Sequence, residues 1–128
     1  MRYRATFISA LSVLLLTAVP VAKSAERGLL NEIPAEFRGR WVVSLDQCVD
    51  PAEGGLYISD RQLDFFEGSA FVVSARRTDD LKLEVDLSMR SKSRVNQRQL
   101  RLFTLSQDRR SLTESRSDSS RIVRVRCD

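Results

Sequence analysis

The stretch IPAEFRGRWVV, residues 33–43, contains the only tryptophan of the chain, Trp41. Its first half predicts one turn that packs against an end of the domain through Phe37. From Trp41 onward the pattern changes to period two, with Trp41, Val43 and Leu45 on one face of a strand. We therefore expect the first strand to begin here, and the later strands to be arranged around it.

Short alternating segments follow, separated by turns of a few residues. The clearest is residues 81–89, where five apolar side chains alternate strictly with polar ones, as in a strand with one buried face. Further strands are expected within residues 56–59, 62–67, 70–77, 95–105, 111–115 and 121–127, after a loop at 46–55. The other side chains expected to face inward are Leu56, Ile58, Leu63, Phe65, Phe71, Val73 and Ala75.

The count and spacing of these segments predict an all-β domain, an eight-stranded antiparallel up-and-down barrel. An open sheet of sequential strands has two edges to protect, and closure removes both. A β-sandwich is the alternative. We expect a secretory signal peptide at residues 1–24, an N-terminal extension at 25–39 and the barrel domain at 40–128.

The signal peptide is predicted from a basic start, an apolar run over residues 7–19 and small residues near Ala25. Cleavage between Ser24 and Ala25 places Ala22 three residues before the cut, whereas cleavage after Ala25 places Lys23 there. An uncleaved anchor is the rival interpretation, but the apolar run is shorter than the roughly 20 residues that a spanning helix needs. We expect a periplasmic or secreted protein.

The chain has two cysteines, Cys48 and Cys127. In an exported protein this count predicts a disulfide, which would make the start and the end of the fold neighbours. Two thiols alone make no zinc site, and a chain without histidine offers no histidine partner for a catalytic thiolate.

Cleavage of the signal peptide removes Arg2, Arg4 and Lys23 and leaves 18 of the 21 basic residues against 17 acidic ones. A nearly neutral mature chain argues against nucleic-acid binding. Residues 26–89 carry 7 bases and 13 acids, whereas residues 90–126 carry 11 bases and 3 acids. This polarity could orient the protein on an anionic envelope surface, but solvated outer faces of strands are the preferred explanation.

The motif Gly39-Arg40-Trp41, at the start of the first strand of an exported barrel, resembles the lipocalins and their calycin relatives. The resemblance implies that Gly39 lets the chain turn into the barrel and that Trp41 plugs the closed end. It also implies a covering arginine from the last strand, either Arg124 or Arg126, which would stack on the ring. In size and compartment the chain is similar to small periplasmic barrels of bacteria, among which are inhibitors of proteases and of lysozyme.

The absence of histidine removes the commonest general base and the usual catalytic triads, and no glycine-rich phosphate loop is present. The carboxylate pair Asp79-Asp80 sits where a turn favours aspartate. Three further carboxylates lack the spacing of a calcium loop: Asp46, Asp50 and Glu53. We therefore expect no catalytic residue, no metal and no cofactor.

Two groups of side chains are candidates for binding. An apolar pocket is one interpretation of four aromatic residues that would otherwise be plain core: Trp41, Phe65, Phe71 and Phe103. An outward contact surface is one interpretation of Arg98 and Arg101, for which a solvated basic face is the alternative.

Taken together, the sequence predicts a monomeric, non-enzymatic binding protein of the cell envelope. The first hypothesis is an interaction or inhibitor-like module that acts on an unknown envelope protein. The alternative is a carrier of a small apolar or anionic ligand inside the barrel, which requires an internal cavity. A hydrolase that uses carboxylates is a third, weaker hypothesis.

Overall fold

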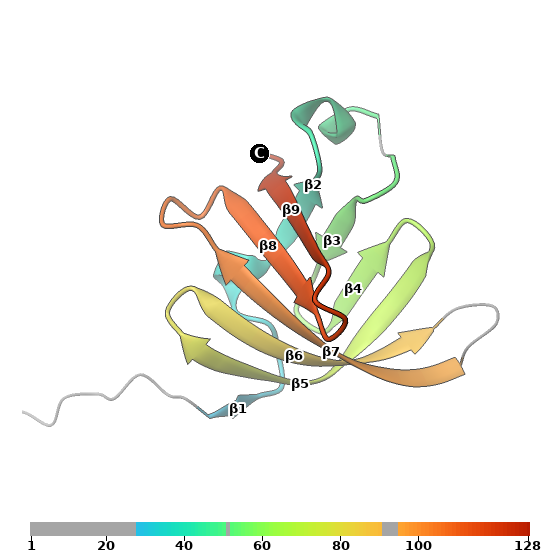
Figure 1. The fold of residues 1–128 in the computed structure, drawn as a ribbon, viewed down its shortest axis with the longest axis vertical. Helices are drawn as coiled ribbons and strands as arrows, with labels where there is room; N and C mark the ends of the chain where they lie inside the picture. The colour runs from blue at the N-terminus through green and yellow to red at the C-terminus, as the bar shows by residue number, and fades with distance from the viewer. Residues whose placement is uncertain (1–27, 51, 91–94) are drawn as a thin grey trace, which may run out of the picture.

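Eight antiparallel strands form a closed barrel in the computed structural model, which describes residues 28–50, 52–90 and 95–128 (Figure 1). The strands are β2 (Gly39–Val42), β3 (Leu56–Ile58), β4 (Gln62–Phe65), β5 (Gly68–Asp79), β6 (Lys82–Arg90), β7 (Val95–Leu105), β8 (Ser111–Arg116) and β9 (Arg121–Arg126). Each pairs with the next along the chain, and β9 pairs with β2 to close the barrel. A short strand, β1 (Leu29–Leu30), pairs with β5. The predicted up-and-down barrel is confirmed, and the sandwich is wrong.

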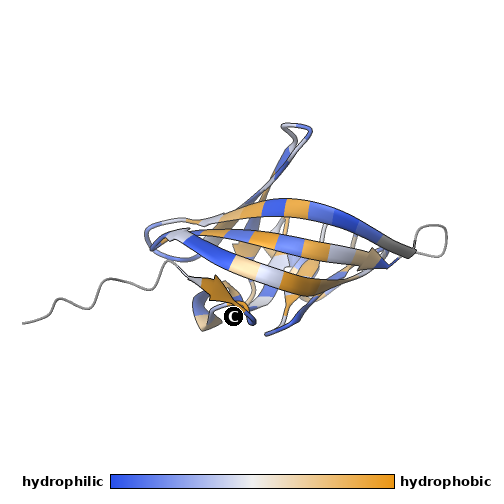
Figure 2. Cartoon of the chain, turned by 90° about the horizontal axis from the view of Figure 1, so that it is seen from below, coloured by the Kyte–Doolittle hydropathy of each residue, from blue (hydrophilic) through white to orange (hydrophobic). Residues whose placement is uncertain are grey.

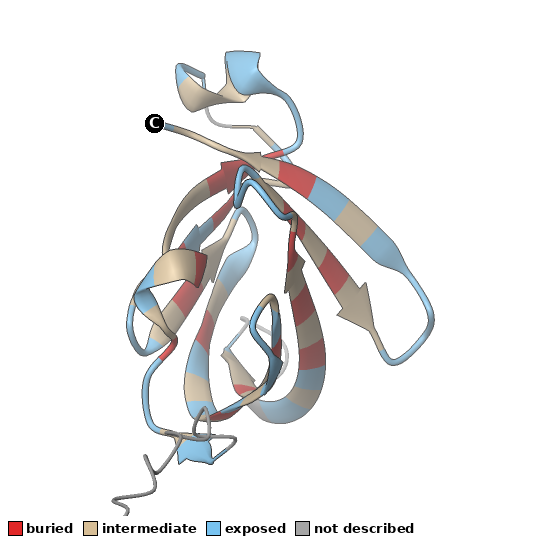
Figure 3. Cartoon of the chain, turned by 90° about the vertical axis from the view of Figure 1, so that its left-hand side faces the viewer, coloured by how far each residue is buried: buried red, intermediate tan, exposed pale blue. Residues whose placement is uncertain are grey.

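The alternation of apolar and polar residues places the core inside the barrel. Leu83, Val85 and Leu87 of β6 are fully buried, and Leu56 and Ile58 of β3 are also buried, as predicted. Figure 2 shows the alternating hydropathy along the long strands, and Figure 3 shows buried residues recurring at intervals along the barrel. Burial of one face of each strand therefore sets the register of the sheet.

The first barrel strand is shorter than predicted. Strand β2 ends at Val42, and a 3-10 helix, η2 (Leu45–Cys48), follows. The backbone N–H of Val43 donates to Oε1 of Gln47 at 3.1 Å instead of to a neighbouring strand. Val43 and Leu45 are exposed and Val42 is buried, so the prediction that Val43 and Leu45 share the face of Trp41 is wrong.

Strand β5 contains a bulge that the alternating pattern does not reveal. The register with β6 shifts between Val72 and Ser74, so one residue is inserted into the alternation. Ala75 is buried as predicted, but Phe71 and Val73 are exposed on the outer face, contrary to the prediction. The ring of Phe71 instead lies under the guanidinium of Arg90, whose carbon is 4.7 Å from the ring centroid.

One end of the barrel is closed by the segment before β2. The 3-10 helix η1 (Ala35–Phe37) buries Phe37 completely, together with Ile33 and Trp41. The indole Nε1 of Trp41 donates a hydrogen bond to the carbonyl oxygen of Phe37 at 2.9 Å. The described part of the predicted N-terminal extension is thus packed on the barrel as its lid.

Of the two arginines considered as the cover of Trp41, Arg126 occupies that place. Its guanidinium carbon lies 4.1 Å from the centroid of the Trp41 ring. Arg126 also donates to the carbonyl oxygens of Arg38 at 2.7 Å and Glu36 at 2.5 Å, which ties the last strand to the lid. Arg124 instead donates to the carbonyl oxygen of Gly54 and to Glu114.

Gly39 is required by both its backbone conformation and its surroundings. Its φ is +118°, and a Cβ added there would lie 3.2 Å from Nη1 of Arg126. We expect Gly39→Ala to lower the free energy of unfolding by about 1–3 kcal/mol, measured by urea denaturation. Gly28→Ala is the matched control, because among the described residues, apart from its chain neighbours, no atom lies within 4 Å of a Cβ at Gly28. Equal stabilities of the two variants would contradict this account of Gly39.

A disulfide joins Cys48 and Cys127, with the two Cα atoms 5.7 Å apart, as predicted. It lies beside the seam between β2 and β9, where pairing is limited to Trp41 with Arg126 and Val42 with Val125. The backbone N–H of Cys127 adds one hydrogen bond to the carbonyl oxygen of Arg40 at 2.9 Å. The covalent link therefore reinforces a short closing seam.

Candidate functional site

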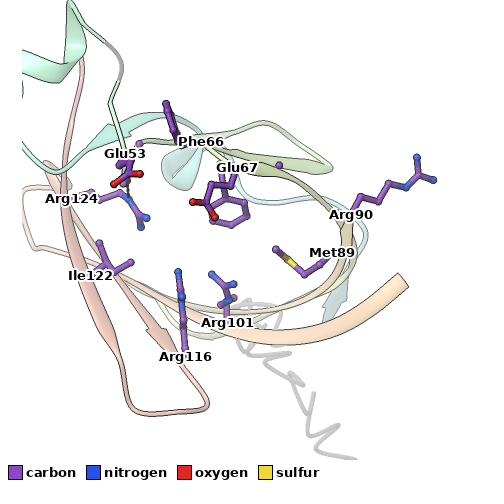
Figure 4. Close-up of a pocket in the computed structure, with 13 residues that line it drawn as sticks. Glu53, Phe66, Glu67, Met89, Arg90, Arg101, Arg116, Ile122 and Arg124 are labelled. Atoms are coloured by element: carbon purple, nitrogen blue, oxygen red, sulfur yellow. Dashed lines mark hydrogen bonds between the residues drawn. The ribbon is translucent and has the colours of Figure 1, made fainter. Parts of the chain in front are cut away.

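A cavity of about 440 Å³ opens at one end of the barrel, and Trp41 is not among the residues that line it (Figure 4). We call it the mouth cavity. It is lined by residues 53–55 before β3, residues 65–68 at the β4–β5 turn, Met89 and Arg90 of β6, Arg101 of β7, Arg116 of β8, and Ile122 and Arg124 of β9. Its volume lies within the range of small-molecule sites in proteins.

Three arginines surround one glutamate on the wall formed by β7, β8 and β9. We call Arg101, Arg116, Arg124 and Glu114 the arginine cluster. Glu114 is 0% exposed, and its Oε1 accepts from Nη1 of Arg101 and, at 3.4 Å, from Nε of Arg116. Its Oε2 accepts from Nη1 of Arg124 at 2.5 Å. Strand register brings these side chains together. Arg101 of β7 pairs with Arg116 of β8, and Glu114 of β8 pairs with Ile122, which lies on the same face of β9 as Arg124.

Two of the arginines are held by further contacts. Arg101 donates to Oε1 of Gln99 at 2.6 Å, and its guanidinium carbon lies 5.4 Å from the centroid of the Phe65 ring. Arg124 donates from Nε to the carbonyl oxygen of Gly54 at 2.5 Å, which links β9 to the loop before β3. Both side chains are therefore fixed in place, with Arg101 only 4% exposed.

Arg116 is held less tightly than the other two arginines. Its side chain is 38% exposed, and its contact with Glu114 is made through Nε alone. In the described ranges its terminal Nη1 and Nη2 donate no hydrogen bond. These two nitrogens are suited to a bidentate interaction with a carboxylate.

The charge of the cluster is unbalanced. Burial alone would raise the pKa of Glu114, but the charges of Arg101, Arg124 and Arg116 and the hydrogen bond from Arg124 outweigh it and hold the pKa below its ordinary value of 4.5. Burial lowers the pKa of Arg101, and the charge of Glu114 acts against this; an arginine in a protein nevertheless stays protonated at neutral pH. Three cations thus face one anion, which leaves two positive charges in excess beside the cavity.

The rest of the lining is apolar or acidic. Phe65, Met89 and Ile122 supply apolar surface. Glu53 and Glu67 lie at exposed positions of the rim, and neither forms an ion pair within the part of the chain that the structure describes. The cavity therefore combines a cationic wall, an apolar interior and an acidic rim.

The residues predicted as an outward contact surface are separated by the structure. Arg98 is exposed on β7 and donates to Asp86, from Nε at 3.0 Å and also from Nη2. Arg101, three positions later, faces the opposite side of the strand and is buried in the arginine cluster. The two side chains lie on opposite faces of β7, because an odd spacing in a strand puts two side chains on opposite faces, although both residues border a groove along the edge of this strand.

The predicted aromatic pocket is also divided. Only Phe65 of the four aromatic residues lines the mouth cavity. Trp41 and Phe103 are buried core, and Phe71 lies on the outer face.

The loop carboxylates considered as catalytic or metal-binding candidates are not grouped into a site among the described residues. Oδ1 of Asp79 accepts from the backbone N–H of Leu81 at 2.8 Å, as expected of a turn aspartate. Among the described residues no three acidic, cysteine or histidine side chains lie together as a metal site would require, Asp46, Asp50 and Glu53 included.

Glu114 and Arg116 are members of the arginine cluster that were not predicted from the sequence. The signal was present, because Leu112, Glu114 and Arg116 share one face of β8 and Leu112 is core. A carboxylate at an inward position among arginine-rich strands indicates a buried ion-pair network.

Comparisons with protein-family models, with curated proteins and with solved structures gave no match. Within the residues that can be described, none of the helices has the length and hydrophobicity to cross a membrane. The mouth cavity is therefore the feature of this protein from which a function can be inferred.

Proposed function

We propose that this protein is an exported, non-enzymatic binding protein of calycin-like build that holds a small organic anion in the mouth cavity. The observation that carries the proposal is the arginine cluster, which presents more positive than negative charge to the cavity. Buried charge without a counter-ion is costly, so an anionic group bound there is stabilised by the cluster.

The apolar lining favours an organic anion over a simple inorganic one. Phe65, Met89 and Ile122 offer surface to a hydrocarbon part, and the terminal nitrogens of Arg116 offer hydrogen bonds to a carboxylate. A pocket of mostly apolar walls with few directed polar groups is typical of small-molecule sites.

Export is part of the proposal. The disulfide between Cys48 and Cys127 fits an oxidising compartment such as the periplasm. The expected signal peptide, residues 1–24, lies outside the described residues. The stacking of Arg126 on Trp41 beside Gly39 supports kinship with the lipocalins and other calycins.

Isothermal titration with octanoate tests the proposal. We expect octanoate to bind the mature, disulfide-bonded protein, and Arg116→Gln to weaken binding about tenfold or more, since a charge-assisted contact is lost. The control is Arg121→Gln, because Arg121 is an exposed residue of β9 that does not line the cavity. No octanoate binding, or equal weakening in both variants, would contradict the proposal.

An interaction module remains a second candidate, favoured by the edge of β7. Strand β8 ends at Arg116, opposite Arg101, so among the described residues 97–100 of β7 have only β6 as a neighbouring strand. A groove of about 310 Å³ lies along this edge, lined by residues 97–101 and 116–118. An extended segment of a partner can add to such an edge as a further strand.

Arg98→Glu tests the second candidate, because Arg98 lies on this edge and is exposed. We expect a partner cross-linked in the cell envelope to be lost in Arg98→Glu and at high salt, and to be retained in the control Arg121→Glu. Cross-links that respond to neither the substitution nor the salt would remove this candidate.

A further inference from the structure

We infer that the ligand of the mouth cavity is a zwitterion that carries an ammonium group as well as a carboxylate, joined by an apolar spacer. The inference rests on the proposed function and adds a second recognition element to it. That element is the β4–β5 turn, with Phe66 and Glu67 at its tip.

The two residues of this turn are not those that a tight hairpin favours. Phe65 pairs with Gly68, so Phe66 and Glu67 form a two-residue connection, a place where Asn-Gly or Asp-Gly is preferred. Phe66 is 61% exposed although it is a large apolar residue. Neither turn preference nor burial therefore accounts for this pair of residues.

Glu67 has the chemistry of an ammonium site, because its carboxylate supplies a counter-charge to an alkylammonium cation. The side chain of Phe66 is directed away from the cavity (Figure 4). Figure 4 shows Glu67 extending into the cavity from the side across from Arg101 and Arg116. Arg90, which also lines the cavity, directs its guanidinium to the Phe71 ring and forms no ion pair with Glu67.

Glu67 also makes the cavity selective. A carboxylate facing the arginine cluster repels a ligand that is only anionic and attracts one that has a positive end. Discrimination by a repulsive element of this kind is a common device of specific sites. A ligand with opposite charges at its two ends matches both walls, and the apolar lining between them matches the spacer.

The probes that test this inference share one chain length and differ in their end groups: octanoate, 8-aminooctanoate and octylamine. Titration of the mature, disulfide-bonded protein is expected to give tightest binding for 8-aminooctanoate, by about tenfold over octanoate. In Glu67→Gln we expect the order to reverse, because 8-aminooctanoate loses its counter-charge and octanoate loses a repulsive neighbour. Glu84→Gln is the matched control, since Glu84 is paired with Arg76 on the outer face of the sheet.

The outcomes separate this inference from the proposed function. If octanoate binds as tightly as 8-aminooctanoate, or if Glu67→Gln leaves the order unchanged, the inference is wrong and the anion site stands. If neither octanoate nor 8-aminooctanoate binds, both are wrong. If octylamine binds tightest, the cavity selects a cation, and the inference is wrong together with the proposed function.

Discussion

Glu114→Gln is expected to lower the free energy of unfolding by about 3–5 kcal/mol, because it leaves the buried guanidiniums of Arg101 and Arg124 without their counter-ion. Both arginines donate to Glu114, and all three side chains are almost fully buried. Urea denaturation of the oxidised protein measures the difference. The control is Glu84→Gln, whose partly exposed ion pair with Arg76 is worth at most about 1 kcal/mol. A loss no larger than that of the control would contradict the account of the arginine cluster.

The acid sensitivity of the protein provides a second readout for Glu114. Its pKa in the folded state lies below the ordinary 4.5, because the arginines favour the carboxylate over the acid. The stabilisation is therefore fully present above about pH 4.5 and is lost as the pH falls through the folded-state pKa. As the pH is lowered from 5, we expect the free energy of unfolding to fall further in the wild type than in Glu114→Gln. Other carboxylates with lowered pKa values, such as Asp86 beside Arg98, act equally in both proteins.

Cys127→Ser has the second large expected effect, a loss of about 4.5 kcal/mol under oxidising conditions. The disulfide closes a loop with a sequence separation of 79 residues, and the entropy that it removes from the unfolded chain grows with loop length. Thermal unfolding with and without a reductant measures it. Reduced wild type is expected to unfold like the variant. An unchanged melting temperature in oxidised Cys127→Ser would show that the bridge contributes no stability.

The barrel was predictable because the alternation of apolar and polar residues within each short segment of sequence identifies the strands. Alternation such as Leu83, Val85, Leu87 specifies which face of a strand is buried, and eight such strands with short turns have few ways to protect their edges. The cysteine pair supplied one long-range constraint, which places the end of β9 beside η2.

The misassigned residues depend on features that alternation does not encode. Phe71 and Val73 changed faces because one residue is inserted as a bulge in β5, and the sequence of the strand gives no sign of it. Val43 and Leu45 lie outside the barrel because β2 ends before them, where the backbone N–H of Val43 donates to the side chain of Gln47. In both places a local departure from regular strand pairing changes which apolar residues are exposed.

The candidate site was harder to predict because it joins side chains from three strands. Arg101, Glu114 and Arg124 lie on three consecutive strands, 13 and 10 residues apart, and each alone resembles part of a solvated face. Their burial is stable only in combination, since a lone charge inside the barrel would be prohibitively costly. The odd spacing of Arg98 and Arg101 predicts that they lie on opposite faces of β7. That Glu114 is the partner of Arg101 follows only from the register of β7, β8 and β9.

The central claim is that an organic anion binds at the arginine cluster. The most direct test is to follow the arginine Nε–Hε and backbone resonances of the isotope-labelled protein by NMR during titration with octanoate. The account predicts that the shifts concentrate on Arg116, Arg124 and Ile122, and that the indole N–H of Trp41 at the closed end does not move. Shifts spread over exposed arginines such as Arg98 and Arg121, or no shifts at all, would contradict it.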